Sequence, residues 1–421
     1  MINRSGAFLS IHHIGGRAGT REFPVMEAFE KDMESVLYDA DQSCIEAIIH
    51  STRHLASKTV VLPWLIGGVT GEADFYITGD RYASSLSKIL PEKSAYYSYT
   101  LNFAWDCDPE SYQIDEKVRL KMTTLDDIHD GKTPQETLPP DFLSIDAEGA
   151  EFDILSGAKD LLVRHIICIK AEVAFLPFRE NHKMVHEVQA YLEKKGFSMV
   201  DLTPFRSDGK YHRPLPIGLR GHGIDGFGDA LFFKEGDRIV AGHLNPAADL
   251  IKGAFMAISF SKFETAHGYL DLLKKYPDAL AAVPDEPSYA RFVKEFARIR
   301  DRYPRIFPIP FSIIFPTLES RKNRFQESLE QPDKGRLREA YFRRINFQDF
   351  KKNLPVIFTG TPIGVEDLCL KYGLTGQAEI LMEKRHQQII GLLNRLGFLA
   401  KDDEGNFVID HQALLSYEQS F

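Results

Sequence analysis

The sequence is poor in cysteine, and its four cysteines form no C-x-x-C pair. Cys44, Cys107, Cys168 and Cys369 lie far apart, so we expect neither a disulfide framework nor a thiolate zinc site. No apolar run approaches the ~20 residues that cross a membrane, and no basic segment followed by an apolar stretch marks the N-terminus. These absences predict a soluble protein of the reducing cytoplasm, without a membrane span.

An excess of positive charge is also missing, because 51 Lys and Arg face 60 Asp and Glu, for a net charge of −9. A general nucleic-acid binder shows a basic face or stripe, so no nucleic-acid partner is expected. No internal repeat or low-complexity segment is evident. The length of 421 residues exceeds the usual size of one domain and predicts two.

Residues 1–240 alternate strand-like and helix-like segments, as in an α/β sheet with helices on both faces. The expected strands are Phe8–Ile14, Ser35–Tyr38, Thr59–Leu65, Phe142–Ile145 and Ile166–Glu172, with a closing pair at Met199–Leu202 and Ala230–Lys234. The expected helices are Phe23–Met33, Cys44–Leu55 and Val185–Lys195, and Pro204–Gly228 is expected to be a loop over the site. Residues 241–421 show helical spacing and few strand signals, which predicts an appended, mainly helical domain.

The most informative stretch is Leu143–Ala158, which reads LSIDAEGAEFDILSGA. An apolar strand ends at Asp146, the chain turns through Glu148, and a helical pattern begins at Ala150. Open α/β sheets bind ligands at the carboxyl ends of their strands, where this turn would lie. Carboxylates on a half-buried turn are costly unless they have partners or a function. We interpret Asp146 and Glu148 as functional, and Glu151 as an acid that favours the helix dipole.

The pattern I-D-A-E-G-A-E-x-x-I-L-x-G-A resembles the signature of the FkbM family of S-adenosylmethionine-dependent methyltransferases. Its surroundings agree with the family in T-L-D at 124–126, the serine pair Ser84-Ser85, Glu172 at the end of the next strand, and Gly196-Phe197. The similarity covers roughly residues 7–235. It implies a Rossmann-like class I methyltransferase sheet, with S-adenosylmethionine as cofactor.

The first expected strand runs into the turn His13-Ile14-Gly15-Gly16-Arg17-Ala18-Gly19. Glycines in such a turn let the backbone approach a ligand and leave helix N–H groups free. The family's turn reads D-x-G-A-N-x-G, so Gly15 and Gly19 match it and His13 replaces its Asp. His13 is then either a replacement contact or a simple strand-end residue. We expect His13, Gly15, Gly16 and Gly19 to bind the cofactor.

Three further residues are expected around the cofactor. Asp39, about 20 residues after the glycine turn, aligns with the family's Glu and would accept hydrogen bonds from the two ribose hydroxyls. Ile66, before Gly67-Gly68, would lie beside the adenine, unless this segment is a hairpin turn. Ser84 of the serine pair would line the site.

Methyl transfer needs an in-line approach by a nucleophile, and a hydroxyl acceptor also needs a base or a metal for its proton. Asp146 and Glu172, at the ends of neighbouring expected strands, would converge near the methyl group. Together with Glu148 they would either hold a magnesium ion through oxygen ligands or supply the base. The competing bases are histidines in the expected loops, namely His129, His165, His182, His186, His212 and His222.

We therefore predict an S-adenosylmethionine-dependent methyltransferase that O-methylates a small-molecule or glycan acceptor. The alternative is a non-catalytic binding module with a degenerate methyltransferase fold, which His13 in place of Asp would suit. A nicotinamide-dependent oxidoreductase is the weaker reading, because the turn lacks the G-x-G-x-x-G spacing. The C-terminal helices would serve acceptor recognition or self-association into a homo-oligomer.

Overall fold

The computed structural model describes residues 8–15, 22–24, 27–41, 45–52, 58–90, 92, 113–130, 137–207, 224–302, 372, 399–401 and 407–409. The chain divides into two compact units, Met1–Lys294 and Glu295–Phe421. The described strands of the second unit are β11 (Leu399–Lys401) and β12 (Phe407–Ile409), which pair antiparallel. No helix in the described part of the chain is long and apolar enough to span a membrane.

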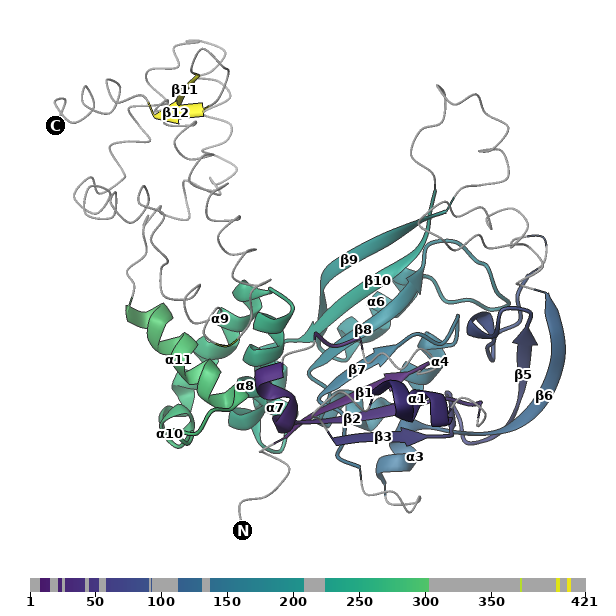
Figure 1. The fold of residues 1–421 in the computed structure, drawn as a ribbon, viewed down its shortest axis with the longest axis horizontal. Coiled ribbons are helices and arrows are strands. Elements are labelled where there is room, and N and C mark those ends of the chain that lie inside the picture. Colours follow the sequence, from purple (N-terminus) through teal and green to yellow (C-terminus); the bar gives the residue numbers. More distant parts are fainter. Residues whose placement is uncertain are drawn as a thin grey trace. The chain divides into compact units, whose positions relative to one another are not determined.

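The first unit is built on a seven-stranded sheet with the order β3-β2-β1-β7-β8-β10-β9 (Figure 1). Its strands are β1 (Leu9–Ile14), β2 (Met33–Tyr38), β3 (Lys58–Leu62), β7 (Phe142–Ile145), β8 (Cys168–Ala174), β9 (Phe197–Ser207) and β10 (Ile224–Lys234). The first five of these pair parallel, whereas β10 runs antiparallel to both β8 and β9. The chain leaves β1 toward β2 and later returns on its other side as β7. The carboxyl ends of β1 and β7 therefore form a topological switch point, where open α/β sheets bind ligands.

A smaller sheet and the helices complete the unit. The smaller sheet has the order β4-β6-β5, with β4 (Leu65–Ile66), β5 (Gly71–Thr78) and β6 (Ile114–Thr123). The helices before the last strands are η3 (Glu27–Asp32), α1 (Ile45–Thr52), η5 (Arg81–Ala83), α3 (Leu125–His129), α4 (Glu151–Ser156), α5 (Lys159–Arg164) and α6 (Val185–Lys194). Those after β10 are α7 (Gly236–Gly242), α8 (Pro246–Ser259), α9 (Phe263–Leu272), η8 (Leu273–Lys275), α10 (Pro277–Ala281) and α11 (Tyr289–Arg302).

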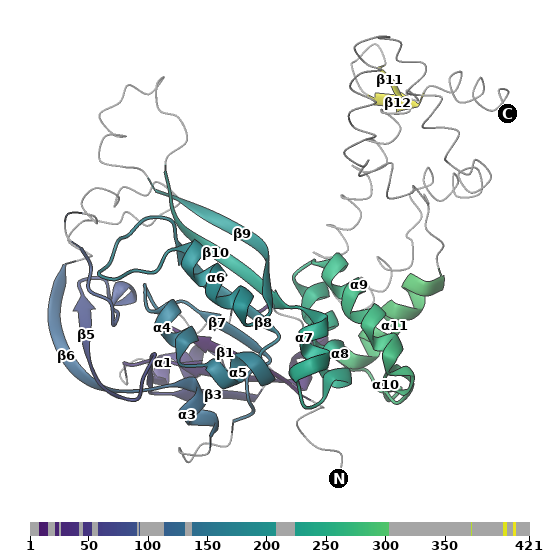
Figure 2. The same cartoon turned by 180° about the vertical axis from the view of Figure 1, so that it is seen from behind.

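The two faces of the main sheet bury different sets of apolar side chains. On one face, Ile145 and Ile169 belong to a core shared with Leu155 of α4, Leu162 of α5 and Leu192 of α6 (Figure 2). On the other face, aromatic side chains of the sheet meet the helices that follow β10. Burying this apolar surface on both faces is the main favourable term in the stability of the unit.

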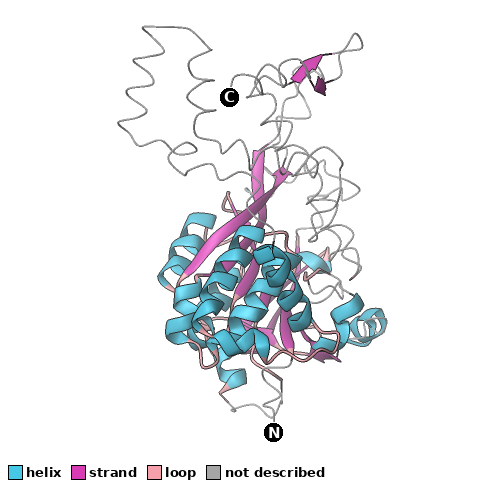
Figure 3. Cartoon of the chain, turned by 90° about the vertical axis from the view of Figure 1, so that its left-hand side faces the viewer, coloured by secondary structure: helices cyan, strands magenta, loops and turns pink. Residues whose placement is uncertain are grey.

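The helices after β10 lie toward the amino ends of the parallel strands (Figure 1), and the view from that side shows helices in front of the sheet (Figure 3). The ring of Phe142 stacks on Phe260, which directly follows α8, with centroids 5.6 Å apart. Phe29 packs edge-on against Phe255 of α8 at 5.2 Å. The first compact unit accordingly continues to Lys294, beyond the boundary expected near residue 240. Independent folding of residues 1–240 and 241–421 stays a prediction.

Most of the expected strands are confirmed, including the antiparallel closing pair β9 and β10. Two expectations are corrected. The helix expected over Phe23–Met33 is a 3-10 helix at Glu27–Asp32, because Met33 already pairs with Leu9 in the sheet. The strand expected over Thr59–Leu65 ends at Leu62, because Pro63 has no N–H to continue the ladder.

The loop expected over Pro204–Gly228 is also corrected at both ends. Strand β9 continues to Ser207 and β10 begins at Ile224. Both ends of the expected loop are therefore strand residues that pair with each other. The aromatic residues there favour a half-buried, pleated surface over an open loop. The middle of this segment, residues 208–223, lies outside the described residues.

Candidate active site

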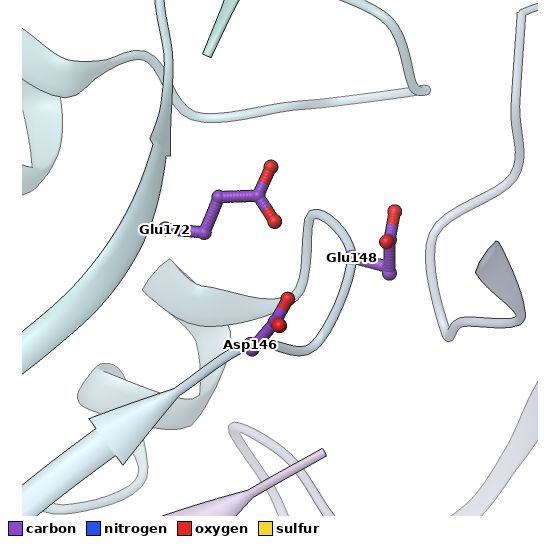
Figure 4. Close-up of side chains that lie close together, drawn as sticks. All are labelled: Asp146, Glu148 and Glu172. Carbon is purple, nitrogen blue, oxygen red and sulfur yellow. The ribbon is translucent and has the colours of Figure 1, made fainter. Parts of the chain in front are cut away.

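Three carboxylates meet at the switch point of the main sheet. Ile145, the last residue of β7, pairs with Ala171 of β8, so Asp146 directly follows β7 and Glu172 lies beside it in β8, two residues before the end of that strand. Glu148 follows in the turn after β7. One oxygen from each of the three side chains lies within 4.8 Å of the others, and Figure 4 shows the side chains gathered around one space. The structure thus brings together the three acids that the sequence singles out.

The turn after β7 has an unusual backbone, which Glu151 holds in place. Glu148 and Gly149 both have positive φ angles, of 56° and 96°. The carboxylate oxygen Oε1 of Glu151 accepts hydrogen bonds from the N–H groups of Ala147 and Gly149, each at 3.0 Å. Burial raises the pKa of Glu151 to about 7, against the effect of these bonds. The structural interpretation of Glu151 fits these contacts: it orders the turn.

Arg179 holds Glu148 from the loop that follows β8. Its Nη2 lies 2.5 Å from Oε2 of Glu148 and also donates to the carbonyl of Ala83 at 3.1 Å, while Nη1 donates to the carbonyl of Ser87 at 3.1 Å. Arg179 is buried, and a Cβ on Gly149 would lie 2.6 Å from its Cδ. Arg179 therefore fixes and neutralises one acid of the three. Sequence analysis missed it, because a single arginine in a loop has no characteristic spacing.

Asp146 and Glu172 behave as a coupled pair. Burial, then the charge of Glu148, raises the pKa of Asp146 to about 6, while its hydrogen bond with Glu172 acts in the opposite direction. Burial and the charges of Glu148 and Asp146 raise the pKa of Glu172 well above its ordinary value. Two such carboxyls share a proton, or a cation takes the place of that proton.

A second polar group lies next to these acids on the same face of the sheet. Lys170, two residues before Glu172 on β8, bonds to Asp229 at 2.8 Å and also pairs with Glu22. On the neighbouring strands, Nδ1 of His13 lies 2.5 Å from Oγ of Ser144. Burial is the main cause that lowers the pKa of His13 to about 4, so its ring is neutral near pH 7. His13 thus has a partner within the sheet, and its contact with a cofactor stays a prediction.

The glycine turn touches the acidic turn. Gly15 has a φ of 96°, and a Cβ there would lie 1.8 Å from the carbonyl oxygen of Asp146. Only glycine fits this position, so Gly15 lets β1 and β7 approach closely at the site. Gly16 and Gly19 lie outside the described residues.

The other residues expected at the cofactor occupy distinct places. Asp39 directly follows β2, and its Oδ1 accepts a hydrogen bond from the N–H of Asp41 at 2.8 Å. Ile66 is buried in the core. The Oγ of Ser84 accepts from the N–H of Thr78 at 3.2 Å, whereas Ser85 donates to the carbonyl of Ala147 at 3.0 Å. Ser85 is therefore the serine that contacts the acidic turn, and the cofactor roles of Asp39, Ile66 and Ser84 stay predictions.

Among the competing histidines that the structure describes, His182 lies at the turn. Its Nε2 would lie 3.4 Å from a Cβ on Gly149, and its Nδ1 is buried with no hydrogen-bond partner among the described residues. Burial, then the charge of Arg179, lowers the pKa of His182 to about 4. His129 packs its ring against His12 at 5.4 Å instead. His212 and His222 lie outside the described residues.

The acidic turn, Glu151 and Arg179 lie inside a segment that matches a known protein family. Residues 25–199 match the family model of the methyltransferase FkbM domain. The chain carries an FkbM methyltransferase domain. The resemblance of the I-D-A-E-G-A-E motif to this family is therefore confirmed, and the seven-stranded sheet with its helices fits a methyltransferase-like fold. No protein of curated function and no solved structure matches the chain. A non-catalytic binding module is not favoured by the match.

Proposed function

We propose that this protein transfers a methyl group from S-adenosylmethionine to a hydroxyl group of a small molecule or glycan. The observation that supports this most directly is the cluster of Asp146, Glu148 and Glu172 at the switch point between β1 and β7. In an FkbM methyltransferase domain, this is the sheet edge where a ligand is expected.

The residues at this edge suit the proposed donor. When bound, S-adenosylmethionine supplies an activated methyl group on a cationic sulfur. Of the three clustered acids, Arg179 neutralises Glu148, so Asp146 and Glu172 leave negative charge to attract a cation. Asp39 directly follows β2, the strand next to β1, and would accept hydrogen bonds from the ribose hydroxyls. His13, Gly15, Gly16, Gly19, Ile66 and Ser84 would complete the cofactor site.

Asp146 and Glu172 would deal with the proton of the acceptor hydroxyl. Because the two carboxyls share a hydrogen bond, one of them is ionised while the other carries the proton. The ionised carboxylate can accept the acceptor's proton as its oxygen attacks the methyl carbon. Alternatively, the three oxygens hold Mg²⁺, which prefers such ligands and would weaken the O–H bond of the acceptor.

Calorimetric titration of the full chain with S-adenosylmethionine tests donor binding. The Asp39→Ala variant should bind at least ~10-fold more weakly, because it loses two charge-assisted hydrogen bonds worth about 1.5–3 kcal/mol each. Asp41→Ala is the matched control, since it keeps the backbone N–H that bonds to Asp39. Equal affinity in Asp39→Ala would remove the ribose assignment, and a wild type that binds no donor would overturn the proposed function.

Catalysis is tested by release of demethylated cofactor in the presence of candidate glycan and small-molecule acceptors. Asp146→Asn and Glu172→Gln should each lower turnover by ~10²–10⁴-fold, and the double variant should be little worse than either alone. Loss of activity with a chelator and recovery with Mg²⁺ would assign the acids as ligands. Chelator-resistant activity would assign a base, and full activity in Asp146→Asn would contradict both roles.

A further inference from the structure

The acids at the carboxyl edge lie beside a row of phenyl rings on the same face of the sheet. Asp229 of β10 pairs with Glu172 of β8, and Phe227 pairs with Ala174 two positions further along. Residues two apart on a strand point to the same face and lie roughly 7 Å apart. Phe227 therefore presents its ring on the face that carries Asp229 and Glu172.

Two more rings extend this row in opposite directions. Phe205 of β9 pairs directly with Phe227, and their ring centroids are 5.6 Å apart. Phe178, in the loop after β8, meets Phe227 edge-on at 6.3 Å with an interplanar angle of 80°. The carbonyl of Phe178 accepts a hydrogen bond from Leu90 at 2.9 Å, which fixes this loop in place. Phe178, Phe205 and Phe227 form what we call the aromatic row.

The aromatic row is placed where the sheet is not covered by the helices that pack against its other end. Phe205 is 36% exposed, and Phe178 and Phe227 are half-buried. By contrast, Phe142 of β7 and Phe233 of β10 lie on the same face at the end of the sheet that packs against the helices, and both are buried. Apolar rings in partial contact with solvent, next to hydrogen-bond acceptors, have the composition of a ligand site rather than of a core.

The juxtaposition of rings and carboxylates selects one kind of acceptor. A sugar ring has an apolar C–H face that packs on phenyl rings and a rim of hydroxyl donors that carboxylates accept. Thr203 of β9 pairs with Asp229 of β10 and adds a further hydroxyl next to the aromatic row. A planar phenolic acceptor would stack on the rings but has fewer hydroxyl groups, so it would offer fewer donors to Asp146, Glu172 and Thr203 than a pyranose does.

We propose that the aromatic row is an acceptor subsite that stacks a pyranose ring and presents one of its hydroxyls to Asp146 and Glu172. This inference rests on the proposed methyl transfer and names its acceptor class, a sugar. The subsite itself needs only the described residues of β8, β9, β10 and the loop after β8.

Saturation-transfer NMR on the full chain tests the subsite with methyl α-D-glucopyranoside, methyl α-D-mannopyranoside and methyl α-L-rhamnopyranoside, with catechol as the planar comparison. Each probe is titrated with and without S-adenosylhomocysteine. We expect at least one glycoside to bind through protons of one ring face. Phe227→Ala should weaken this binding about tenfold, the loss for a stacking contact of about 1.4 kcal/mol.

Further variants test whether sugar binding needs a flat aromatic ring or only an apolar side chain of similar volume. Phe227→Leu should bind sugar nearly as poorly as Phe227→Ala, whereas Phe205→Trp should bind at least as well as the wild type. Leu244→Ala is the control, because Leu244 is 85% exposed and belongs to the helical end of the unit. Calorimetric binding of S-adenosylmethionine should be unchanged in all four variants, which shows that they fold.

Sugar binding and donor binding fail independently in this design. If the donor binds but no glycoside does, or if catechol alone binds, the sugar subsite is overturned while methyl transfer stands. Sugar binding that survives Phe227→Ala also overturns it. If sugars bind through the aromatic row but the donor does not bind, the proposed methyl transfer fails and the subsite is supported.

Discussion

The acidic side chains at the two ends of the parallel strands differ in whether a basic residue neutralises them. At the amino ends, Asp141 precedes β7, and Nζ of Lys252 lies 2.8 and 2.9 Å from its two carboxylate oxygens. The N–H of Ser10 donates to the same carboxylate at 2.8 Å. At the carboxyl ends, Asp146 and Glu172 meet each other, and the nearby Arg179 pairs with Glu148 instead. One end is neutralised by the fold, and the other keeps negative charge.

This difference separates a structural role from a functional one. A buried ion pair that is fully hydrogen-bonded keeps an element in register, although its net contribution to stability is small. Here it joins α8 to the strand β7. Carboxyls whose pKa values are raised by burial and by neighbouring negative charge cost stability unless a proton, a metal or a ligand joins them, which is typical of functional sites. The amino ends of the strands therefore have the features of a stabilising contact, and the carboxyl ends have those of the proposed active site.

The largest expected effect comes from breaking the pair at the amino ends. Lys252→Met leaves the buried charge of Asp141 without its partner and should lower the free energy of unfolding by about 3–5 kcal/mol. Urea denaturation of the full chain measures this. The double variant Asp141→Asn/Lys252→Met should recover most of the loss, because burial raises the pKa of Asp141 even beside Lys252. A single variant as stable as the wild type would show that the pair does not hold α8.

Much of this architecture can be predicted from the sequence where local patterns are strong. The run from Phe142 to Ile145 is a strand at the predicted bounds, and the acids of I-D-A-E-G-A-E come together where a switch point requires. Their alternation with apolar residues and the glycines of the turn carry that signal. The 3-10 helix at Glu27–Asp32 could not be predicted, because its residues have helical spacing, and only pairing with β1 makes Met33 a strand residue.

Partners that come from distant segments could not be predicted. Arg179 reaches Glu148, and Lys252 reaches Asp141, across 31 and 111 positions of sequence. Neither basic residue is part of a motif, so only the folded chain shows which acid each one neutralises. The aromatic row is similar, because Phe205 lies in a segment expected to be a loop and joins the proposed subsite only through its pairing with Phe227.

A smaller effect is expected from the acid that orders the turn at the carboxyl ends. Glu151→Ala leaves the N–H groups of Ala147 and Gly149 without their acceptor and should lower the free energy of unfolding by about 1–3 kcal/mol. Glu151→Gln keeps an acceptor oxygen and should lose less. Asp153→Ala, an exposed acid on the same helix, is the control. If Glu151→Ala lost activity with full stability, Glu151 would belong with the chemistry instead.

The smallest expected effect is a gain in stability at the acidic edge. In the folded protein the pKa of Asp146 is raised to about 6, above its ordinary 3.8, so between these values the folded chain holds more proton than the unfolded chain. By linkage, the contribution of Asp146 to stability is present at pH 4 and is lost as the pH rises through 6. The Asp146→Asn variant has no carboxyl to ionise at this position, so it does not lose this stability as the pH rises.

With chelator present, the melting temperature of Asp146→Asn should equal that of the wild type near pH 4 and exceed it by about 2–4 °C at pH 8. Asp141→Asn, the same substitution at the amino ends, should lower the melting temperature instead, because it removes the carboxylate charge that Lys252 contacts at 2.8 and 2.9 Å. If Asp146→Asn were destabilising at pH 8, Asp146 would be a structural acid like Asp141, and the contrast between the two ends of the sheet would not hold.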